Sequence, residues 1–474
     1  TTIALIDALR ERGIDAAAVL RQPSMGITAA GSKGGASGGG KASLTHPELI
    51  DWGLCGEMGA IEAAQNLLVS FAEKAVDDGK LDTILVPRVS EVPSRSLRQI
   101  AVDRGKGDVA ERVVLTPTCE LMQIVVLSRS MDEISERVAK MVAGTKDGKA
   151  VTFGEFVDLW RITGILGDAV KPAKTETVNG SPVYVHGGPF ANIAHGCNSV
   201  LATQMALTYG DYVITEAGFG ADLGAEKFFN IKCRKAGLSP KLTVIVATAQ
   251  SLKLHGGVPE AQIKEPNKEG LIRGFANLDK HIENMKNFGQ QVIVTFNRFA
   301  SDTDEEIALV AEHCKEKGVG FAVNTVFADG GKGAVELARL VAETIEKNTS
   351  KPLKFTYEES DSIRKKVRKI AEGIYGASSI VYTTLAEKKL KEIEKLGIAH
   401  FPVCIAKTQY SFSSDPKAYG VAKDFELKVR DIIINNGAEM IVVVMGEIMR
   451  MPGLPKEPQA RHIDIVNGLI EGLS

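Results

Sequence analysis

Short runs of apolar, mostly β-branched residues recur along this chain without polar interruption. Such runs are typical of strands that are covered on both faces, as in parallel sheets. Helical patterns lie between many of the runs, and this alternation favours an open, mostly parallel α/β sheet. The expected strands cover residues 14–20, 84–87, 123–127, 211–215, 242–247, 291–296, 320–326 and 441–444. The expected helices cover residues 1–12, 131–142, 197–207, 270–288, 304–317, 333–347 and 360–375.

The length of 474 residues predicts two or three domains, because a single core seldom serves so long a chain. Residues 111–171 interrupt the alternation, and we interpret them as a small inserted α+β domain. Further along, a charged helical stretch and a strand-like run at 396–406 indicate a C-terminal α/β subdomain. The main α/β domain then comprises residues 1–110 and 172–350, and the C-terminal subdomain comprises residues 351–474.

The composition argues against several classes of partner. A formal net charge of −2 provides no basic field for nucleic acid or for an anionic membrane. No apolar run reaches the ~18 residues of a membrane span. The six cysteines lack the close spacing of metal or redox motifs and suit a reducing compartment. We therefore expect a cytoplasmic protein without a nucleic-acid partner or a membrane partner, and without a metal site built from its cysteines.

Residues 26–40 form the most unusual stretch, because seven of the fifteen are glycine and Lys33 lies among them. Glycine at this density costs chain entropy on folding, and close approach of the backbone to an anion is the usual reason. Arg21 stands before this stretch at the end of an expected strand, where ligands bind in open α/β sheets. Its guanidinium can grip a phosphate or a carboxylate. A flexible surface linker is the alternative interpretation.

Two further segments contain candidate site residues. Residues 187–196 (GGPFANIAHG) lead into a helix, and His195 there can donate or shuttle a proton, although a purely structural histidine fits the spacing equally well. Residues 215–234 follow a strand directly, and a tight strand-to-helix turn explains their glycines without any ligand. In this segment Glu216 and Asp222 are candidate metal or hydroxyl partners, and Lys227, Lys232 and Arg234 are candidate phosphate contacts.

Two aromatic residues suggest a site for a flat ring. Phe299 and Phe327 each follow an expected strand and precede a polar or glycine-rich turn. Adjacent parallel strands would bring both rings to one rim, where they can enclose a heterocycle such as a pterin. On the residues alone, two core phenylalanines are the simpler interpretation. Residues 407–416 (KTQYSFSSDP) form a hydroxyl-rich loop after a strand, which places Thr408 at a possible edge of the site.

These segments together resemble the formate–tetrahydrofolate ligase family, also called 10-formyltetrahydrofolate synthetases. The resemblance spans nearly the whole chain in family order and implies a P-loop NTPase-like, mostly parallel sheet. It rests on RQPS at 21–24, KGGASGGG at 33–40, GGPFANIAHG at 187–196, TEAGFGADLGAEKFFNIKCR at 215–234, AKTQYSFS at 406–413 and MPGLPK at 451–456.

The resemblance implies that ATP phosphorylates formate and that the 10-position nitrogen of tetrahydrofolate then attacks the formyl phosphate. Arg21 would hold formyl phosphate, and Phe299 and Phe327 would stack on the pterin, although family members often have Trp at the second position. Glu57 matches a family aspartate near the folate site. The candidate catalytic residues are then Arg21, Lys33 and His195, and the candidate binding residues are Gly34, Gly35, Gly38, Gly39, Gly40, Glu57, Glu216, Lys227, Phe299, Phe327 and Thr408.

The family also carries a P-loop, GxxxxGK[ST], whose lysine and amides hold the ATP phosphates. Here the corresponding helix begins at Thr1, and we expect the gene to encode the loop immediately before it. The implied ligands are ATP, formate, tetrahydrofolate, Mg²⁺ and a monovalent cation, K⁺ or NH₄⁺, and the implied assembly is a homotetramer. Two alternatives stay open: a non-catalytic family member that binds folate or a partner protein, and a different P-loop-like ATPase or kinase.

Overall fold

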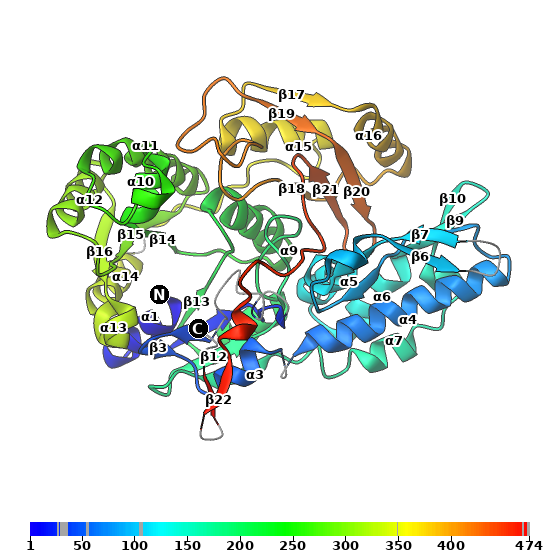
Figure 1. The fold of residues 1–474 in the computed structure, drawn as a ribbon, viewed down its shortest axis with the longest axis horizontal. Helices are drawn as coiled ribbons and strands as arrows, with labels where there is room; N and C mark the ends of the chain where they lie inside the picture. The colour runs from blue at the N-terminus through cyan, green and yellow to red at the C-terminus, as the bar shows by residue number, and fades with distance from the viewer. Residues whose placement is uncertain are drawn as a thin grey trace.

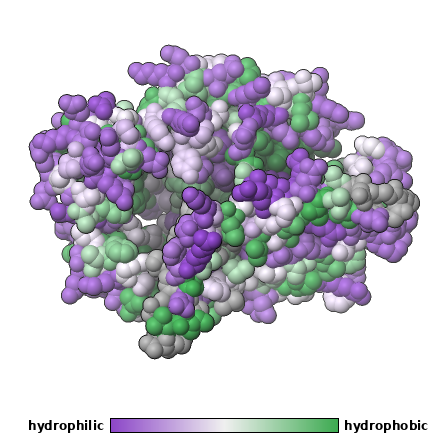
Figure 2. Space-filling model, in the orientation of Figure 1, coloured by the Kyte–Doolittle hydropathy of each residue, from purple (hydrophilic) through white to green (hydrophobic). Residues whose placement is uncertain are grey.

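The computed structural model describes residues 1–25, 28, 37–53, 56–103, 108–347, 349–466 and 469–471. Its elements form a left, an upper and a right lobe that meet at a shared base (Figure 1). The visible face is largely hydrophilic and is hollowed between the left lobe and the centre of the molecule (Figure 2). No helix in the part of the chain that the structure describes is long and apolar enough to cross a membrane.

A four-stranded sheet forms the base, in the order β11 (Ala173–Glu176), β12 (Pro182–Val185), β1 (Ala16–Leu20) and β13 (Tyr212–Thr215). β12, β1 and β13 are parallel, and β11 pairs antiparallel at the edge. Every residue of β1 is buried, because α1 (Thr2–Glu11) covers one face and α8 (Val200–Tyr209) covers the other. The strands expected at 14–20 and 211–215 are confirmed.

The left lobe contains a second parallel sheet, formed by β14 (Leu242–Ala247), β15 (Gln291–Asn297) and β16 (Gly320–Asn324) (Figure 1). These strands confirm the three expected in this region. α1 of the base and α14 of this lobe share one hydrophobic core, which joins the two sheets. The helices of the lobe are α10 (Ala249–His255), α11 (Lys268–Asn287), α12 (Asp304–Glu316), α13 (Val326–Asp329) and α14 (Val335–Glu346).

The right lobe packs four helices, α4 (Glu57–Asp77), α5 (Glu120–Leu127), α6 (Met131–Lys140) and α7 (Trp160–Ile165), around one core. The strand expected at 123–127 is wrong, because these residues belong to α5. Cys119 caps α5, accepting the Met122 N–H, and nearly all of the helix is buried. A short apolar run looks the same in a buried helix as in a buried strand.

Short strands complete the right lobe. The strand expected at 84–87 is largely wrong: β4 ends at Ile84, because it pairs with β9 only through Thr83 and Ile84, and Pro87 has no N–H to donate. The strands are β4 (Thr83–Ile84), β5 (Arg88–Ser90), β6 (Ile100–Asp103), β7 (Asp108–Glu111), β8 (Val113–Leu115), β9 (Val142–Lys146) and β10 (Lys149–Thr152).

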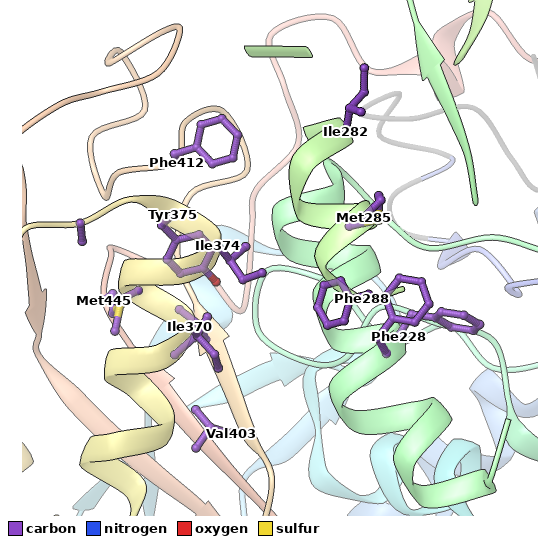
Figure 3. Close-up of a cluster of buried hydrophobic side chains, with 14 of the residues drawn as sticks. Phe228, Ile282, Met285, Phe288, Ile370, Ile374, Tyr375, Val403, Phe412 and Met445 are labelled. Atoms are coloured by element: carbon purple, nitrogen blue, oxygen red, sulfur yellow. The ribbon is translucent and has the colours of Figure 1, made fainter. Parts of the chain in front are cut away.

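The upper lobe packs α15 (Ile363–Ile370) and the turn that follows it against α11, where Ile370, Ile374 and Tyr375 lie opposite Met285 and Phe288 (Figure 3). The strand-like run expected at 396–406 is wrong in its first part. α16 (Thr384–Leu396) ends at Gly397, whose φ of 71° closes the helix. The strands are β17 (Ser379–Tyr382), β18 (Val403–Ala406), β19 (Glu426–Val429), β20 (Asp431–Asn435) and β21 (Met440–Val444).

Parallel sheets with helices on their faces give the chain a mixed α/β fold, as the sequence predicts. The remaining short elements are α3 (Pro47–Asp51), α9 (Arg234–Ala236), β2 (Gly38–Gly39), β3 (Ala42–Ser43), β22 (Asp464–Val466) and β23 (Leu469–Glu471).

Candidate active site

A cavity of about 820 Å³, the active cavity below, lies where the carboxyl ends of strands from both parallel sheets meet. Ligands of open α/β sheets bind at this end of the strands. The first residues of α1 also reach it. The lining comprises Thr1, Thr2, Ile3, Leu20, Arg21, Gln22, Pro23, Ser24, Thr28, Gly38, Gly39, Ala42, Gly188, Phe190, Ala191, Asn192, Glu216, Phe219, Asn297, Val326, Phe327, Gln409, Tyr410, Met449 and Pro452.

Arg21 and Glu216 form a bidentate ion pair in the wall of the active cavity. They meet because β1 and β13 are parallel neighbours, so that both strands end at the same edge of the sheet. Arg21 Nε lies 2.8 Å from Glu216 Oε1, and Nη2 lies 3.0 Å from Oε2. Burial opposes the charge of Arg21, but the adjacent Glu216 carboxylate outweighs burial and raises the pKa of Arg21. The guanidinium is therefore charged and held in place, and its Nη1 takes no part in the pair.

Glycines allow two backbone segments to close around Arg21. A Cβ at Gly218 would lie 2.5 Å from Arg21 Nη1, and a Cβ at Gly188 would lie 2.1 Å from the Gln22 carbonyl oxygen. The Gln22 N–H also donates to the Gly187 carbonyl at 2.9 Å. A side chain at either position would push the backbone away from the guanidinium, so glycine is required here for close approach.

Glu57 and Lys227, two expected binding residues, support the wall of the active cavity from behind. Glu57 is buried and accepts the N–H of Gly187. Lys227 is buried and donates to the Ala191 carbonyl, which belongs to the lining segment. Lys232 and Arg234 likewise donate to protein acceptors. Neither Glu57 nor Lys227 lines the cavity, because each ends on a backbone group beneath its surface.

His195 is fully buried, and neither of its ring nitrogens has a hydrogen-bond partner among the described residues. Burial, with the nearby positive charges of Lys232, Lys227 and Arg21, lowers the pKa of His195 to about 3. The ring is therefore neutral, and it does not line the active cavity. The structure does not support the expected proton shuttle, because a shuttling histidine needs both access to the substrate and a pKa nearer the working pH.

A buried lysine organises the hydroxyl-rich loop at the edge of the active cavity. Lys407 Nζ lies 2.9 Å from Asp222 Oδ2, 3.1 Å from the Thr408 carbonyl and 2.5 Å from the Ser411 carbonyl. The loop therefore wraps around one ammonium group. Gln409 and Tyr410, between these carbonyls, line the cavity, whereas Thr408 itself does not.

Phe327 and Phe299 follow adjacent strands, β16 and β15, as expected. The alternative that both are core residues is wrong, because their exposed fractions are 71% and 42%. Phe327 lines the active cavity and packs against the β2–β3 hairpin, where a Cβ at Gly39 would lie 3.4 Å from its ring. Phe299 lies at the same edge of the sheet but not in the lining, and its N–H donates to Asp302.

Part of the glycine-rich stretch can be placed. Gly38 and Gly39 line the active cavity and form β2 of a tight hairpin. The φ of Gly40 is 59°, and a Cβ there would lie 2.1 Å from the Phe327 carbonyl oxygen, so glycine is needed where the hairpin meets this residue. Lys33, Gly34 and Gly35 lie outside the described residues.

Several lining residues were not named individually from the sequence. Asn297 is ordinary in sequence, whereas Phe190 lies in the segment 187–196 and Met449 lies two residues before the MPGLPK motif, so that only their segments carried a signal. Tyr410 lies in the hydroxyl-rich loop that the sequence singled out, so its segment was the available signal.

In the part of the chain that the structure describes, no group of three or more His, Cys, Asp or Glu side chains could hold a metal ion.

Glu91 couples the segment after Arg21 to the right lobe. It is buried and accepts the Met25 N–H at 2.8 Å. Burial is the main reason why the pKa of Glu91 rises from 4.5 to about 7, and nearby Glu62 adds to the rise, although the Met25 hydrogen bond opposes it. At neutral pH this carboxyl group is therefore near its titration midpoint.

We expect the Glu91→Gln variant to lose less stability than the unmodified protein as pH rises from 5 to 7. Between these values the folded Glu91 keeps a proton that the unfolded chain has released, so its contribution to stability falls with rising pH and levels off above the folded pKa. The two proteins should differ by at most about 3 kcal/mol in the free energy of unfolding that they lose over this pH range. Urea denaturation midpoints at several pH values measure it, with Glu316→Gln on the exposed face of α12 as control. If the stability of both proteins changed with pH in the same way, the result would contradict the raised pKa of Glu91.

The fold and the active cavity define an α/β protein whose arginine-containing site lies at the carboxyl ends of parallel strands. Comparison with protein-family models matches residues 1–474 to the family described as formate–tetrahydrofolate ligase. The chain belongs to this family.

Individual relatives agree with the family match. A formate–tetrahydrofolate ligase of Parabacteroides distasonis is 63% identical over 100% of this chain and 87% of its own length. The corresponding ligase of Bacteroides fragilis is 54% identical over the same shares. That of Bifidobacterium longum is 58% identical over 81% of this chain and 73% of its own length.

Proposed function

We propose that this protein joins formate to tetrahydrofolate at the expense of ATP, through formyl phosphate, to give 10-formyltetrahydrofolate, ADP and phosphate. Membership of the formate–tetrahydrofolate ligase family supports the overall reaction. The observation that carries the mechanism is the clamped Arg21 guanidinium. It lines the same cavity as a helix start, which suits phosphates, and an exposed aromatic ring, which suits a pterin.

Phosphoryl transfer depends mainly on positioning and on neutralising charge. Thr1 and Thr2 at the start of α1 line the active cavity, and the start of a helix suits the binding of ATP phosphates. In our proposal Arg21 binds the carboxylate of formate and then the phosphoryl group of formyl phosphate. Its partner Glu216 keeps the guanidinium in one orientation. Lys33, Gly34, Gly35, Gly38, Gly39 and Gly40 form the remainder of the anion-binding loop in this proposal.

The second step is attack by the 10-position nitrogen of tetrahydrofolate on the formyl carbon. Phe327 supports the pterin from its exposed position at the rim, and Phe299 lies at the same edge of the sheet. Tyr410 and Met449 supply further ring and apolar surface, and the Lys407-centred loop that includes Thr408 presents Tyr410. Apolar walls of this kind also keep water from the labile formyl phosphate. Glu57 and Lys227 act in this proposal by supporting the segment at 187–196, which contains the buried His195.

Cations and assembly form part of the same proposal. Mg²⁺ binds such sites largely through substrate phosphates, and the hydroxyl-bearing residues Thr1 and Thr2 line the active cavity, where they could complete its coordination. When bound, it would neutralise charge on the phosphates. We also propose a requirement for K⁺ or NH₄⁺, a homotetrameric assembly and a P-loop NTPase-like main domain. The main domain comprises residues 1–110 and 172–350, the small inserted domain residues 111–171, and the C-terminal subdomain residues 351–474.

Protein expressed from the complete gene tests the reaction directly. It is mixed with ATP, Mg²⁺, K⁺, formate and tetrahydrofolate, then acidified, and the absorbance of methenyl-tetrahydrofolate is read. We expect product only when ATP, formate and tetrahydrofolate are all present. A folded protein that binds tetrahydrofolate but forms no product would indicate a non-catalytic family member. ATP turnover that does not need formate would favour a different ATPase or kinase.

A further inference from the structure

A fully buried amide, the side chain of Asn198, joins the carboxyl ends of β1 and β13. Its Nδ2 donates to the Val19 carbonyl at 2.9 Å and to the Thr215 hydroxyl at 2.7 Å. Val19 and Thr215 are the last residues that face each other in the register of these two parallel strands. Asn198 therefore connects the strands at the point where their pairing ends.

The orientation of this amide is fixed by the groups on its other side. Asn198 Oδ1 accepts from Lys232 Nζ at 2.6 Å and from the Thr203 hydroxyl at 3.1 Å. The ammonium group of Lys232 can only donate, so the amide oxygen faces it and the Nδ2 group faces the strands. Both donors and both acceptor positions of the amide are then used, and a fully bonded buried group of this kind is rigid.

The backbone that carries Asn198 is also held in place. The next residue, Ser199, caps α8 with its side chain, and its N–H donates to the His186 carbonyl at 3.0 Å. On the preceding side, the Gly196 carbonyl accepts the N–H of Gly218 at 3.1 Å. The amide therefore acts on the ends of β1 and β13 from a fixed position.

These two strand ends carry the ion pair of the active cavity. Arg21 lies two residues after Val19, and Glu216 follows Thr215 directly. Besides the two guanidinium contacts, the backbone N–H of Arg21 donates to Glu216 Oε1 at 3.0 Å. The pair therefore depends on the separation of the two backbones as well as on the conformations of the two side chains.

We propose that Asn198 is a positioning residue for the formation of formyl phosphate, because it holds β1 and β13 at the separation that the Arg21–Glu216 pair requires. The inference rests on the proposed function, which assigns formate and formyl phosphate to Arg21. Asn198 does not line the active cavity, so it acts through the ion pair and does not contact the substrate. Small displacements of a group that orients a reactant lower the rate steeply.

Steady-state kinetics in two backgrounds test the proposal. We expect Asn198→Ala to lower kcat roughly tenfold or more, while the KM for tetrahydrofolate stays within about twofold of its original value. When Asn198→Ala is added to Arg21→Ala, the further change in kcat should be less than about twofold, because the group that Asn198 positions is already absent. Equal fold losses of kcat in both backgrounds would indicate a general structural role and would overturn the proposal.

Two further variants separate positioning from a loss of stability. Asn284 is also fully buried, and its Nδ2 donates to the Ile374 carbonyl at 3.0 Å, so Asn284→Ala should lower stability but not kcat. If Asn198→Ala does not fold, Thr215→Val removes one of the hydrogen bonds and keeps the shape of the side chain. We expect it to lower kcat about threefold, again only when Arg21 is present. An unchanged kcat in Thr215→Val would then contradict the proposal.

Crystal structures of the unmodified protein and of the Asn198→Ala or Thr215→Val variant give a comparison that does not depend on turnover. We expect the variant to lose at least one of the two guanidinium hydrogen bonds between Arg21 and Glu216. A pair with both hydrogen bonds unchanged would overturn the proposal. An unmodified protein that forms no product would instead contradict the proposed function, and the crystal structures would still decide whether Asn198 holds the pair.

Discussion

We expect Arg21→Ala to lower kcat about 10²- to 10³-fold in the formyl-transfer assay while tetrahydrofolate still binds. The variant loses the cation that faces formate and formyl phosphate. It also removes the guanidinium that faces the Glu216 carboxylate through two hydrogen bonds of 2.8 Å and 3.0 Å, so this negative charge is left uncompensated by Arg21 beside an anionic intermediate. Steady-state kinetics measure the loss, and calorimetry with tetrahydrofolate shows whether the folate part of the site is intact.

Related variants separate charge from geometry at this position. Arg21→Lys keeps the charge but cannot form the fork-shaped contact, so we expect an intermediate kcat. Adding Glu216→Gln to Arg21→Ala removes the negative charge that Arg21 no longer balances and should recover part of the loss. Arg339→Ala is the matched control, because Arg339 also forms two hydrogen bonds with one carboxylate, that of Glu336, but on the surface of α14. Full activity in Arg21→Ala would rule out the assigned role.

The largest expected effect on stability is at a buried ion pair between α10 and α12. Lys253 and Glu306 are both fully buried, with 3.1 Å between Nζ and Oε1. Glu306 also accepts the Asn267 N–H at 3.0 Å, and Lys253 donates to the Glu265 carbonyl at 2.8 Å. We expect Lys253→Met to lower the free energy of unfolding of the left lobe by about 3–5 kcal/mol, because it leaves a buried carboxylate without its cation. Urea denaturation followed by circular dichroism measures the change.

A neighbouring pair supplies the control for this variant. Lys268 and Glu305 join α11 to α12 in the same region, but their side chains are more than half exposed. Lys268→Met should therefore change stability by less than about 1 kcal/mol. The double variant Lys253→Met/Glu306→Gln is expected to be more stable than Lys253→Met, because the uncompensated charge is gone. Equal losses in Lys253→Met and Lys268→Met would contradict this account.

The pH dependence of this pair has a defined direction. Burial alone would raise the pKa of Glu306, but the Asn267 N–H and Lys253 outweigh burial and lower it. A carboxylate with a lowered folded pKa contributes stability above its unfolded pKa, and this contribution is lost as pH falls through the folded value. The left lobe should therefore lose this part of its stability only in acid, whereas the contribution of Glu91 falls as pH rises towards neutrality.

Local sequence patterns were sufficient for the parallel strands and for the position of Arg21. The apolar runs of β1, β14 and β15 are long enough, and sufficiently bounded by helices, to identify buried parallel strands. Because ligands bind at the carboxyl ends of such strands, Arg21, Glu216 and Phe327 could be located near a site from the sequence alone. The turn residues next to Arg21, Glu216 and Phe327 also indicated a site at this edge of the sheet.

Only the tertiary structure decided which side chains face the active cavity. Residues 123–127 form part of a helix that packs against α4, α6 and α8. An apolar run can bury its side chains as a helix or as a strand, so these tertiary contacts decided the conformation. His195 and Lys227 lie in promising motifs, yet both are buried behind the cavity wall. The carboxylate partners of Arg21 and Lys407 are 195 and 185 positions away in the chain, so no local pattern could indicate them. Strand identity follows from short-range periodicity, whereas burial, charge pairing and the shape of a cavity depend on contacts between distant segments.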